Sequence, residues 1–286
     1  DARQLGVPAA AHHASRWAHA VTTRLKRACA RLGLHAMTLV MLVPFAVLAM
    51  LSVARSWRYP TLWPSAWQLD QWRVFGDQGA ALASAALQST TLALVVAVTA
   101  TVIGFFTSQA VAGHRHEQRW MALALLPYAL PPVVFAIGIG QAWAALHLSG
   151  STAGVVLAQL PFATAYAVLL CRGYWTAHTL ALAELAMSLG AHGAQLWWRL
   201  HWPLARGIVG LCLLQTALLS WFDFALVRLV GAGQVETLSF KVFEYFNGGD
   251  LRLASTAALL LLTPPLLALL WRPGLLSPAL LKGPSP

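Results

Sequence analysis

Charged side chains are scarce in this chain: Asp, Glu, Lys and Arg make up 10% of its 286 residues. Soluble domains carry roughly a quarter, so the deficit excludes a fold whose whole surface faces water. The formal net charge is +10, but the basic residues flank apolar runs instead of forming the basic face of a soluble nucleic-acid-binding protein. We therefore expect an integral membrane protein that lies in a lipid bilayer and has no nucleic-acid partner.

Motifs for catalysis and for nucleotide binding are also missing. A phosphate-binding loop has the pattern GxxxxGK[ST], and none of the lysines, Lys26, Lys241 and Lys282, ends such a pattern. HExxH and GxSxG do not occur. The cysteines are too far apart for a CxxC motif, and the histidines at 12–13 and 114–116 supply fewer ligands than a metal site requires. We expect no enzyme activity, no metal site and no cofactor in this chain.

Apolar residues are concentrated in long runs. A helix needs about 20 of them to cross the hydrocarbon core of a bilayer, and six stretches approach that length. They are 34–54, 85–109, 120–146, 153–171, 207–227 and 253–271. The sequence therefore predicts an all-α integral membrane protein with six transmembrane helices in one domain, 34–272, which follows an amino-terminal segment, 1–33, and precedes a tail, 273–286.

Lysine and arginine set the expected orientation, because they are enriched in cytoplasmic loops. If the amino terminus is inside, most of the 19 lysines and arginines fall on the inside segments. Both termini are therefore predicted to be cytoplasmic. The outer loop 57–72 is rich in Trp, Tyr and Pro, which favours a position along the outer lipid interface.

Prolines and small residues interrupt the predicted spans. The prolines are Pro127, Pro131 and Pro132 in the third span, Pro161 in the fourth, and Pro264 with Pro265 in the sixth. Each removes a backbone hydrogen bond, and in a membrane the freed carbonyl must be met by a neighbour or by water. Gly138 and Gly140 would allow helices to approach closely. Two interpretations stay open: general helix packing, or kinked helices that line a path which opens and closes.

The inward loop between the fourth and fifth spans has a pattern of its own. Residues 179–187 and 195–202 have good helix propensity, and Gly190 with Gly193 between them permits a sharp change of direction. Pro203 suits the first turn of the next helix, where no N–H is needed. The sequence predicts helix, turn, helix on the cytoplasmic side. An alternative is an amphipathic helix in the lipid headgroups, anchored by tryptophans, but that alternative does not account for the spacing of Glu184, Gly190 and Pro203.

That spacing resembles a known family motif. The stretch ELAMSLGAHGAQLWWRLHWPLARG, from Glu184 to Gly207, is similar to the EAA loop of the permeases of binding-protein-dependent ABC importers. The family pattern is Glu-Ala-Ala, three residues, Gly, nine residues, Ile, one residue, Leu-Pro. Glu184, Ala186, Gly190 and Pro203 fall on their positions, and the three departures replace one apolar residue with another.

Three further stretches resemble the wider permease pattern. LQSTTLALVVAVTATVIGFF is similar to the start of the family's core, and LPYALPPVVFAIGIGQAW to the proline-rich third span of the group that serves iron, thiamine, polyamines, sulfate and aminophosphonates. SWFDFALVRLVGAG is similar to the acidic-aromatic end of the fifth span in that group. The resemblance covers about residues 34–272.

The resemblance implies a MetI-like fold in the bacterial inner membrane and a coupling helix that docks in a groove of a separate ATPase subunit. The residues to which it assigns this role are Glu184, Leu185, Ala186, Leu189, Gly190, Arg199 and Pro203. Positive-inside topology accounts for Arg199 equally well. The implied partners are an ATPase dimer that binds MgATP, a second permease subunit or half, and a periplasmic solute-binding protein.

Four residues are candidates for a translocation path or gate: Pro131, Gln141, Asp223 and Phe224. Carboxylates in or near a span are candidates for function by default, although Asp223 has a possible structural partner in Arg228. The outer segment TLSFKVFEYF has helical apolar spacing, typical either of a contact with the binding protein or of a plain interfacial helix. A self-contained secondary transporter or channel is the alternative function, and it predicts several paired charges at mid-membrane.

Overall fold

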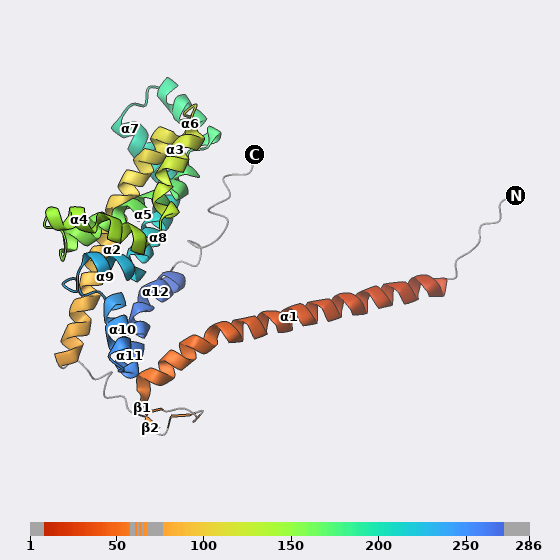
Figure 1. The fold of residues 1–286 in the computed structure, drawn as a ribbon. Coiled ribbons are helices and arrows are strands. Elements are labelled where there is room, and N and C mark those ends of the chain that lie inside the picture. The colour runs from red at the N-terminus through yellow and green to blue at the C-terminus, as the bar shows by residue number, and fades with distance from the viewer. Residues whose placement is uncertain (1–8, 58–60, 62, 65, 68–76, 272–286) are drawn as a thin grey trace. The chain divides into compact units, whose positions relative to one another are not determined.

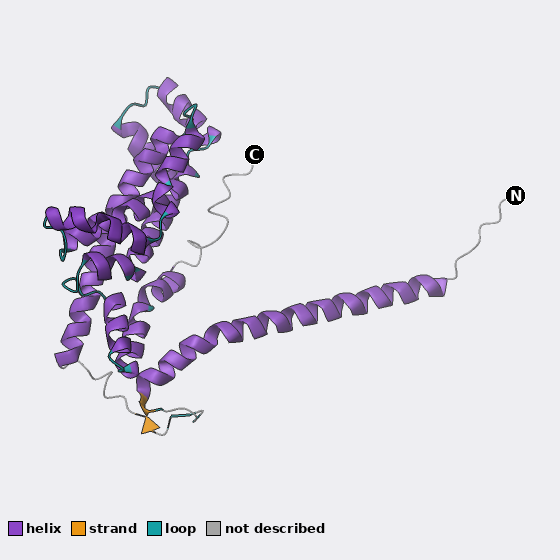
Figure 2. Ribbon diagram, in the orientation of Figure 1, coloured by secondary structure: helices purple, strands orange, loops and turns teal. Residues whose placement is uncertain are grey.

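The computed structural model describes residues 9–57, 61, 63–64, 66–67 and 77–271. Residues 1–8 of the predicted amino-terminal segment and the tail 273–286 lie outside the described residues. The described part is helical except for one short antiparallel hairpin and the connecting loops (Figure 2). Within these residues, five helical stretches are long and apolar enough to cross a membrane: Cys29–Val53, Ala80–Val111, Thr152–Arg172, Ala194–Phe222 and Leu251–Ala268. The prediction of a helical membrane protein is confirmed at this level.

The chain divides into two units, Asp1–Leu51 and Ser52–Pro286. Helix α1 (Ala9–Val53) makes up the described part of the first, and it begins well before the predicted span at 34–54 because no proline or turn residue interrupts the Ala- and Arg-rich segment before Gly33. The elements of the second unit are β1 (Ala54–Ser56), β2 (Ala66–Trp67), α2 (Asp77–Val111), α3 (Glu117–Ala124), η1 (Leu126–Ala129), α4 (Pro132–Ala145), α5 (Thr152–Arg172), α6 (Ala177–Ser188), α7 (Ala194–Leu196), η2 (Trp197–His201), α8 (Trp202–Phe222), α9 (Ala225–Val230), α10 (Leu238–Asn247), α11 (Leu251–Leu261) and α12 (Thr263–Trp271).

Helices α2, α5 and α8 form the core of the second unit. Lipid tails are as apolar as leucine, so helices in a membrane associate by close packing rather than by the hydrophobic effect. The α2–α5 contact is built accordingly: Val96 and Ala100 meet Val155 and Ala158, all fully buried. At Gly104 even a methyl group would overlap the side chain of Ala167. The small residues of α2 therefore set how closely the two helices approach.

The third predicted span, 120–146, is not one helix. It is divided into α3, the 3-10 turn η1 and α4, with the chain extended at Leu130 and Pro131. The prolines explain the breaks, since Pro127 lies in the first turn of η1 and Pro132 begins α4. Helix α4 is apolar, but it is shorter than the five candidate spans. The expected close approach at Gly138 and Gly140 is not made, because no atom of the described residues lies within 4 Å of an added Cβ at either glycine.

The fifth and sixth predicted spans also differ from the helices observed. Helix α8 begins earlier than 207 and ends at Phe222, so Asp223 interrupts the predicted span 207–227 instead of lying near its end. The predicted span 253–271 consists of α11 and α12. The carbonyls freed by Pro264 and Pro265 are met as a membrane requires: Thr263 Oγ1 donates to Leu260 O at 2.7 Å, and Trp221 Nε1 donates to Leu261 O at 2.9 Å.

Helix α2 joins the two ends of the second unit (Figure 1). At one end, here the α6 end, lie α6, α7 and the beginning of α3; at the other, the α10 end, lie α10 and α11. The 35 residues of α2 extend over about 52 Å at 1.5 Å per residue, more than the roughly 30 Å of a hydrocarbon core. The loop that resembles the EAA motif therefore lies far from α10.

Candidate functional site

The predicted helix–turn–helix is present in the loop between α5 and α8. Thr176 begins it as an N-cap, because its side chain accepts a hydrogen bond from the Thr179 N–H. Helix α6 then runs to Ser188, slightly longer than the predicted 179–187. Gly190 and Gly193 follow, and both have positive φ, +89° and +50°. Because L-residues are strained in that region, the glycines fulfil the turn that the sequence predicts.

The second helix of the loop differs from the prediction in its geometry. It starts at α7 and continues into α8 without interruption, but residues Trp197–His201 form a single π-helical turn in which the Trp202 N–H donates to the Trp197 carbonyl. Pro203 is the second residue after that turn. A proline supplies no N–H to the carbonyl four residues earlier and clashes with it, so the wider turn accommodates Pro203 without breaking the helix.

The outer face of this helix–turn–helix is unusually apolar for a loop. Leu185 is 58% exposed and Leu189, at the tip, is 81% exposed. On the inner face Ala183 is buried. Beside the tip, the turn encloses a hollow of about 370 Å³ lined by Ala186, Leu189, Gly190, Ala191, Gln195, Leu196, Arg199 and Leu200. Four of the seven predicted coupling residues thus line this hollow: Ala186, Leu189, Gly190 and Arg199. Leu185 is exposed one helical turn before Leu189.

The other two predicted coupling residues have different surroundings. Glu184 is exposed, and within the described residues the structure gives its carboxylate no ion pair or capping contact. Pro203 lies away from the hollow, at the start of α8. Pro203 therefore shapes the helix rather than forming part of the exposed surface.

An aromatic cluster joins the loop to the helices beneath it. Trp175 is 1% exposed, its ring lies 5.2 Å from that of Phe105 on α2 and 5.3 Å from that of His201, and its Nε1 donates to Ser108 Oγ at 3.0 Å. The Tyr174 hydroxyl is hydrogen bonded to His201 Nδ1 at 3.0 Å, and burial raises the pKa of Tyr174 to about 12. The loop is thus fixed to α2 and α8 at its base.

The three tryptophans of the loop have different surroundings, one packed in the aromatic cluster and two exposed. Trp197 packs its ring against Phe105 and Phe106, whereas Trp198 is 68% exposed and Trp202 49% exposed. The alternative of a simple interfacial helix predicts that all three tryptophans anchor in headgroups, and the position of Trp197 in the cluster does not fit that expectation.

An ion pair links the base of the loop to α3. Arg172, the last residue of α5, donates from Nε to Glu117 Oε1 at 2.5 Å. This hydrogen bond lowers the pKa of Glu117 below its ordinary value of 4.5. A lowered carboxyl pKa means that the folded protein favours the ionised form, so the pair is intact at neutral pH and is lost only as the pH falls through that pKa.

The four gate candidates lie on two packed elements. Pro131 caps α4 and Gln141 lies on its exposed side, while Asp223 and Phe224 connect α8 to α9. Helices α4 and α9 pack through Ala136 and Leu226 in one buried cluster, against which Phe224 also packs. Of the four candidates, Phe224 therefore packs against this contact, whereas Pro131 and Gln141 are both exposed.

Asp223 belongs to a buried polar network. Its Oδ2 accepts a hydrogen bond from Gln159 Nε2 at 2.7 Å, and its Oδ1 accepts from the Leu226 N–H at 3.3 Å, which caps α9. Gln159 is fully buried on α5 and also accepts from Ser220 Oγ at 2.6 Å. Arg228, the expected partner, instead lies over the ring of Phe240 at 5.5 Å. The suggested Asp223–Arg228 pair is therefore wrong.

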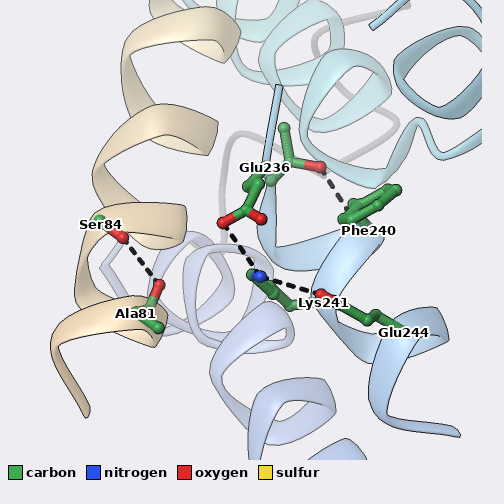
Figure 3. Close-up of polar contacts among 7 residues, drawn as sticks. Ala81, Ser84, Glu236, Phe240, Lys241 and Glu244 are labelled. Atoms are coloured by element: carbon green, nitrogen blue, oxygen red, sulfur yellow. Dashed lines mark hydrogen bonds and ion pairs between the residues drawn. The ribbon is translucent and has the colours of Figure 1, made fainter. Parts of the chain in front are cut away.

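The outer segment forms the predicted helix, α10, whose apolar residues are partly buried at Leu238 and partly exposed. Phe243 and Phe246 are 45% and 59% exposed, whereas Lys241 is buried and bonded to Glu236 at 2.9 Å and Glu244 at 2.8 Å (Figure 3). Burial alone would lower the pKa of Lys241, but the two carboxylates outweigh that effect and raise it. Lys241 therefore stays charged, and its pairs hold the start of α10.

Sequence reasoning missed three of these features: the Gln159 network, the Trp175 cluster and the Arg172–Glu117 pair. Gln159 carried a usable signal, because an amide in the middle of an apolar span requires a partner. The aromatic cluster had no such signal, since its members come from distant parts of the sequence. In the sequence, Arg172 is one of the basic residues that indicate orientation, and nothing local shows its partner. Within the described residues no group of three or more His, Cys, Asp or Glu side chains is placed to hold a metal ion.

Comparison with known proteins adds no family assignment: neither a protein-family model nor a curated protein sequence matches the chain. The class that the fold defines is that of a helical membrane protein with several membrane-spanning helices. Any more specific function rests on the geometry of the loop and on the sequence motif that it carries.

Proposed function

We propose that this chain is the permease subunit of a binding-protein-dependent ABC importer with a MetI-like fold. It passes a small solute across the bacterial inner membrane, with both termini in the cytoplasm. ATP hydrolysis takes place in separate ATPase subunits, a second permease subunit or half completes the path, and a periplasmic binding protein delivers the solute. The divided segment α3–η1–α4 takes the place of the third of six membrane-spanning segments.

The observation that supports the proposal best is the exposed surface of the α6 loop. An apolar helix face can fill a hydrophobic groove of a partner, and Leu185 with Leu189 presents such a face beyond the packed body of the protein. The two positive-φ glycines hold α6 apart from α7, so that the face stays free. The aromatic cluster fixes its base, so a force applied to α6 would reach α2 and α8.

The self-contained transporter is less well supported. That function calls for several paired charges inside the membrane. In the described part of the chain, the buried carboxylate of Asp223 is hydrogen bonded to a neutral amide, Gln159, and to the backbone of α9. In this arrangement the Asp223 side chain binds the first turn of α9 and links it to α5, which is a structural role.

The proposal is tested by replacing Gly190 with valine. At φ +89° a β-branched residue is strongly disfavoured, so we expect the turn to distort and α6 to lose its orientation. The natural chain should retain its ATPase subunits when purified from native membranes in mild detergent. The Gly190→Val chain should insert into the membrane equally well but lose most of the bound ATPase.

Gly210→Val is the matched control. Gly210 lies within α8, its φ is not positive, and among the described residues no neighbouring side chain or helix lies within 4 Å of an added Cβ, so ATPase association should be unchanged. Full association and ATP-dependent uptake in the Gly190→Val chain would count against the proposed role of the loop. Solute uptake by the chain alone in liposomes, without any ATPase, would overturn the proposed function.

A further inference from the structure

Arg172 is bonded to two different parts of the chain at the α6 end. Its Nε donates to Glu117, the first residue of α3, and its Nη1 donates to the carbonyl of Trp175 at 2.7 Å. Trp175 lies two residues before α6 begins, and Arg172 itself ends α5. One guanidinium therefore connects the ends of three helices.

The contribution of this pair is geometric rather than energetic. The side chains of Arg172 and Glu117 are 27% and 31% exposed, and ion pairs exposed to water add little to stability. A guanidinium, however, is a planar and rigid fork, so two hydrogen bonds from one fork fix the relative positions of both acceptors. The pair holds the start of α3 in a fixed place relative to the start of α6.

The bonds from Arg172 to Glu117 and to Trp175 form a joint between α3 and α6. The α6 side of this joint is rigid. Trp175 is buried, and its indole is bonded to Ser108 on α2. Thr176 then caps α6 directly after it, and the Leu180 N–H donates to the Thr176 carbonyl at 3.0 Å. A displacement of α6 would therefore move Trp175, and with it Arg172, rather than be absorbed by a loose linker.

The α3 side of the joint leads to the gate candidates. Helix α3 continues through η1 to Pro131 and α4, and Ala136 of α4 packs with Leu226 of α9. Tyr128 of η1 additionally donates to the Phe162 carbonyl on α5 at 3.1 Å. The chain thus provides a contiguous route from α6 to α4 that does not pass along α5.

We propose that Arg172 is a positioning residue for coupling: through Glu117 it makes α3, and hence η1 and α4, move together with α6. Without the pair, a displacement of α6 would reach α3 and η1 only indirectly, through their packing against α2 and α5. This inference rests on the proposed function, because it supposes that an ATPase displaces α6. On this inference, α3, η1 and α4 are the part of the chain that the ATPase moves.

The first experiment tests the joint in the full chain alone, reconstituted in lipid nanodiscs. Amide hydrogen exchange is measured for Glu117–Ala124 and Ala177–Ser188. Glu117→Gln should raise exchange severalfold in both segments, whereas Glu117→Asp, which keeps the carboxylate, should raise it less. Glu244→Gln, which breaks an ion pair at the other end of the unit, should change neither segment. Faster exchange in α3 alone would show that the pair does not tie α6 and would overturn the inference.

The second experiment tests the movement, with the complex of the chain and its ATPase subunits purified from native membranes. In the natural chain, MgATP with vanadate should change hydrogen exchange in Pro132–Ala145. Glu117→Gln should lose most of that change while ATPase association stays intact, and Glu117→Asp should keep more of it. An equal change in Glu117→Gln would overturn the inference alone. If no ATPase accompanies the natural chain, or if MgATP changes nothing in it, the proposed function fails, whereas the first experiment still decides whether the joint exists.

Discussion

At the scale of single residues, several buried polar side chains are hydrogen bonded to one another across helices. Gln159 is the clearest example, since its amide donates to Asp223 and accepts from Ser220 while none of it is exposed. A buried polar group that loses its partner costs more than the bond contributed, because it keeps its desolvation penalty. A membrane interior offers little water to replace the partner.

We therefore expect Gln159→Leu to destabilise the protein by about 1–3 kcal/mol or more, because it leaves an Asp223 oxygen and the Ser220 hydroxyl unpaired. The measurement is the midpoint of detergent-induced unfolding of the purified full chain. Gln88→Leu is the matched control: Gln88 also bonds across helices, to Thr152, but at an exposed position, so its loss should be small. Equal effects of the two substitutions would show that the Gln159 network is not structural.

The turn glycines could be predicted from the sequence, whereas the partner of Asp223 could not. Gly190 and Gly193 were predictable, because the need for positive φ is a local property that one residue type satisfies. The partner of Asp223 was not, since Gln159 is distant in sequence and only the packing of α5 against α8 brings the two together. Arg228, close in sequence, was the wrong partner for the same reason.

At the scale of elements, the packing of α2 on α5 depends on the absence of a side chain at Gly104. An added methyl group would overlap Ala167 and approach the backbone of α5. Backbone cannot rotate out of the way as a flexible side chain can, so the helices would have to separate. Overpacking of this kind typically costs 1–3 kcal/mol.

Gly104→Ala should therefore lower stability by about 1–3 kcal/mol, although alanine is the better helix former. Gly140→Ala on α4 adds the same methyl group at a place where no neighbouring element of the described chain lies within 4 Å, and it should be neutral or slightly stabilising. Thermal unfolding of the two variants, followed in the same detergent, gives the comparison. A neutral Gly104→Ala chain would mean that α2 and α5 are less closely packed than described.

The elements that sequence predicted least well are those with proline. Periodicity and length identified each apolar segment, but they did not show how a segment divides, because that depends on which neighbour satisfies the freed carbonyls. Trp221 meets the Leu261 carbonyl at the break between α11 and α12. Pro161, by contrast, lies inside α5, which continues past it.

At the scale of the whole molecule, the positive-inside rule and the fold make one joint prediction. The α6 loop and α10 lie at opposite ends of the second unit (Figure 1), and the distribution of Lys and Arg places the former inside the cell and the latter outside. Leu189 and Phe246 are exposed at these two ends, at 81% and 59%, so each is suited to carry a label.

In a Cys29→Ala background, a membrane-impermeant maleimide should label Leu189→Cys only in inside-out vesicles and Phe246→Cys only in right-side-out vesicles. The remaining cysteines, Cys171 and Cys212, are buried and should react in neither. Labelling of both positions from one face would overturn the predicted arrangement of the chain in the membrane. Reversed labelling would keep the arrangement but invert the orientation.

The bare tip of the α6 loop has a consequence for how the protein must be made. Leu189 is 81% exposed. A partner that covers it would remove this exposure, but an uncovered copy is prone to aggregation and to degradation by quality-control proteases. On the proposed function, synthesis of this subunit has to keep pace with that of its ATPase, and any surplus copies would be short-lived. The amount of ATPase subunit would thus limit the amount of this chain in the membrane.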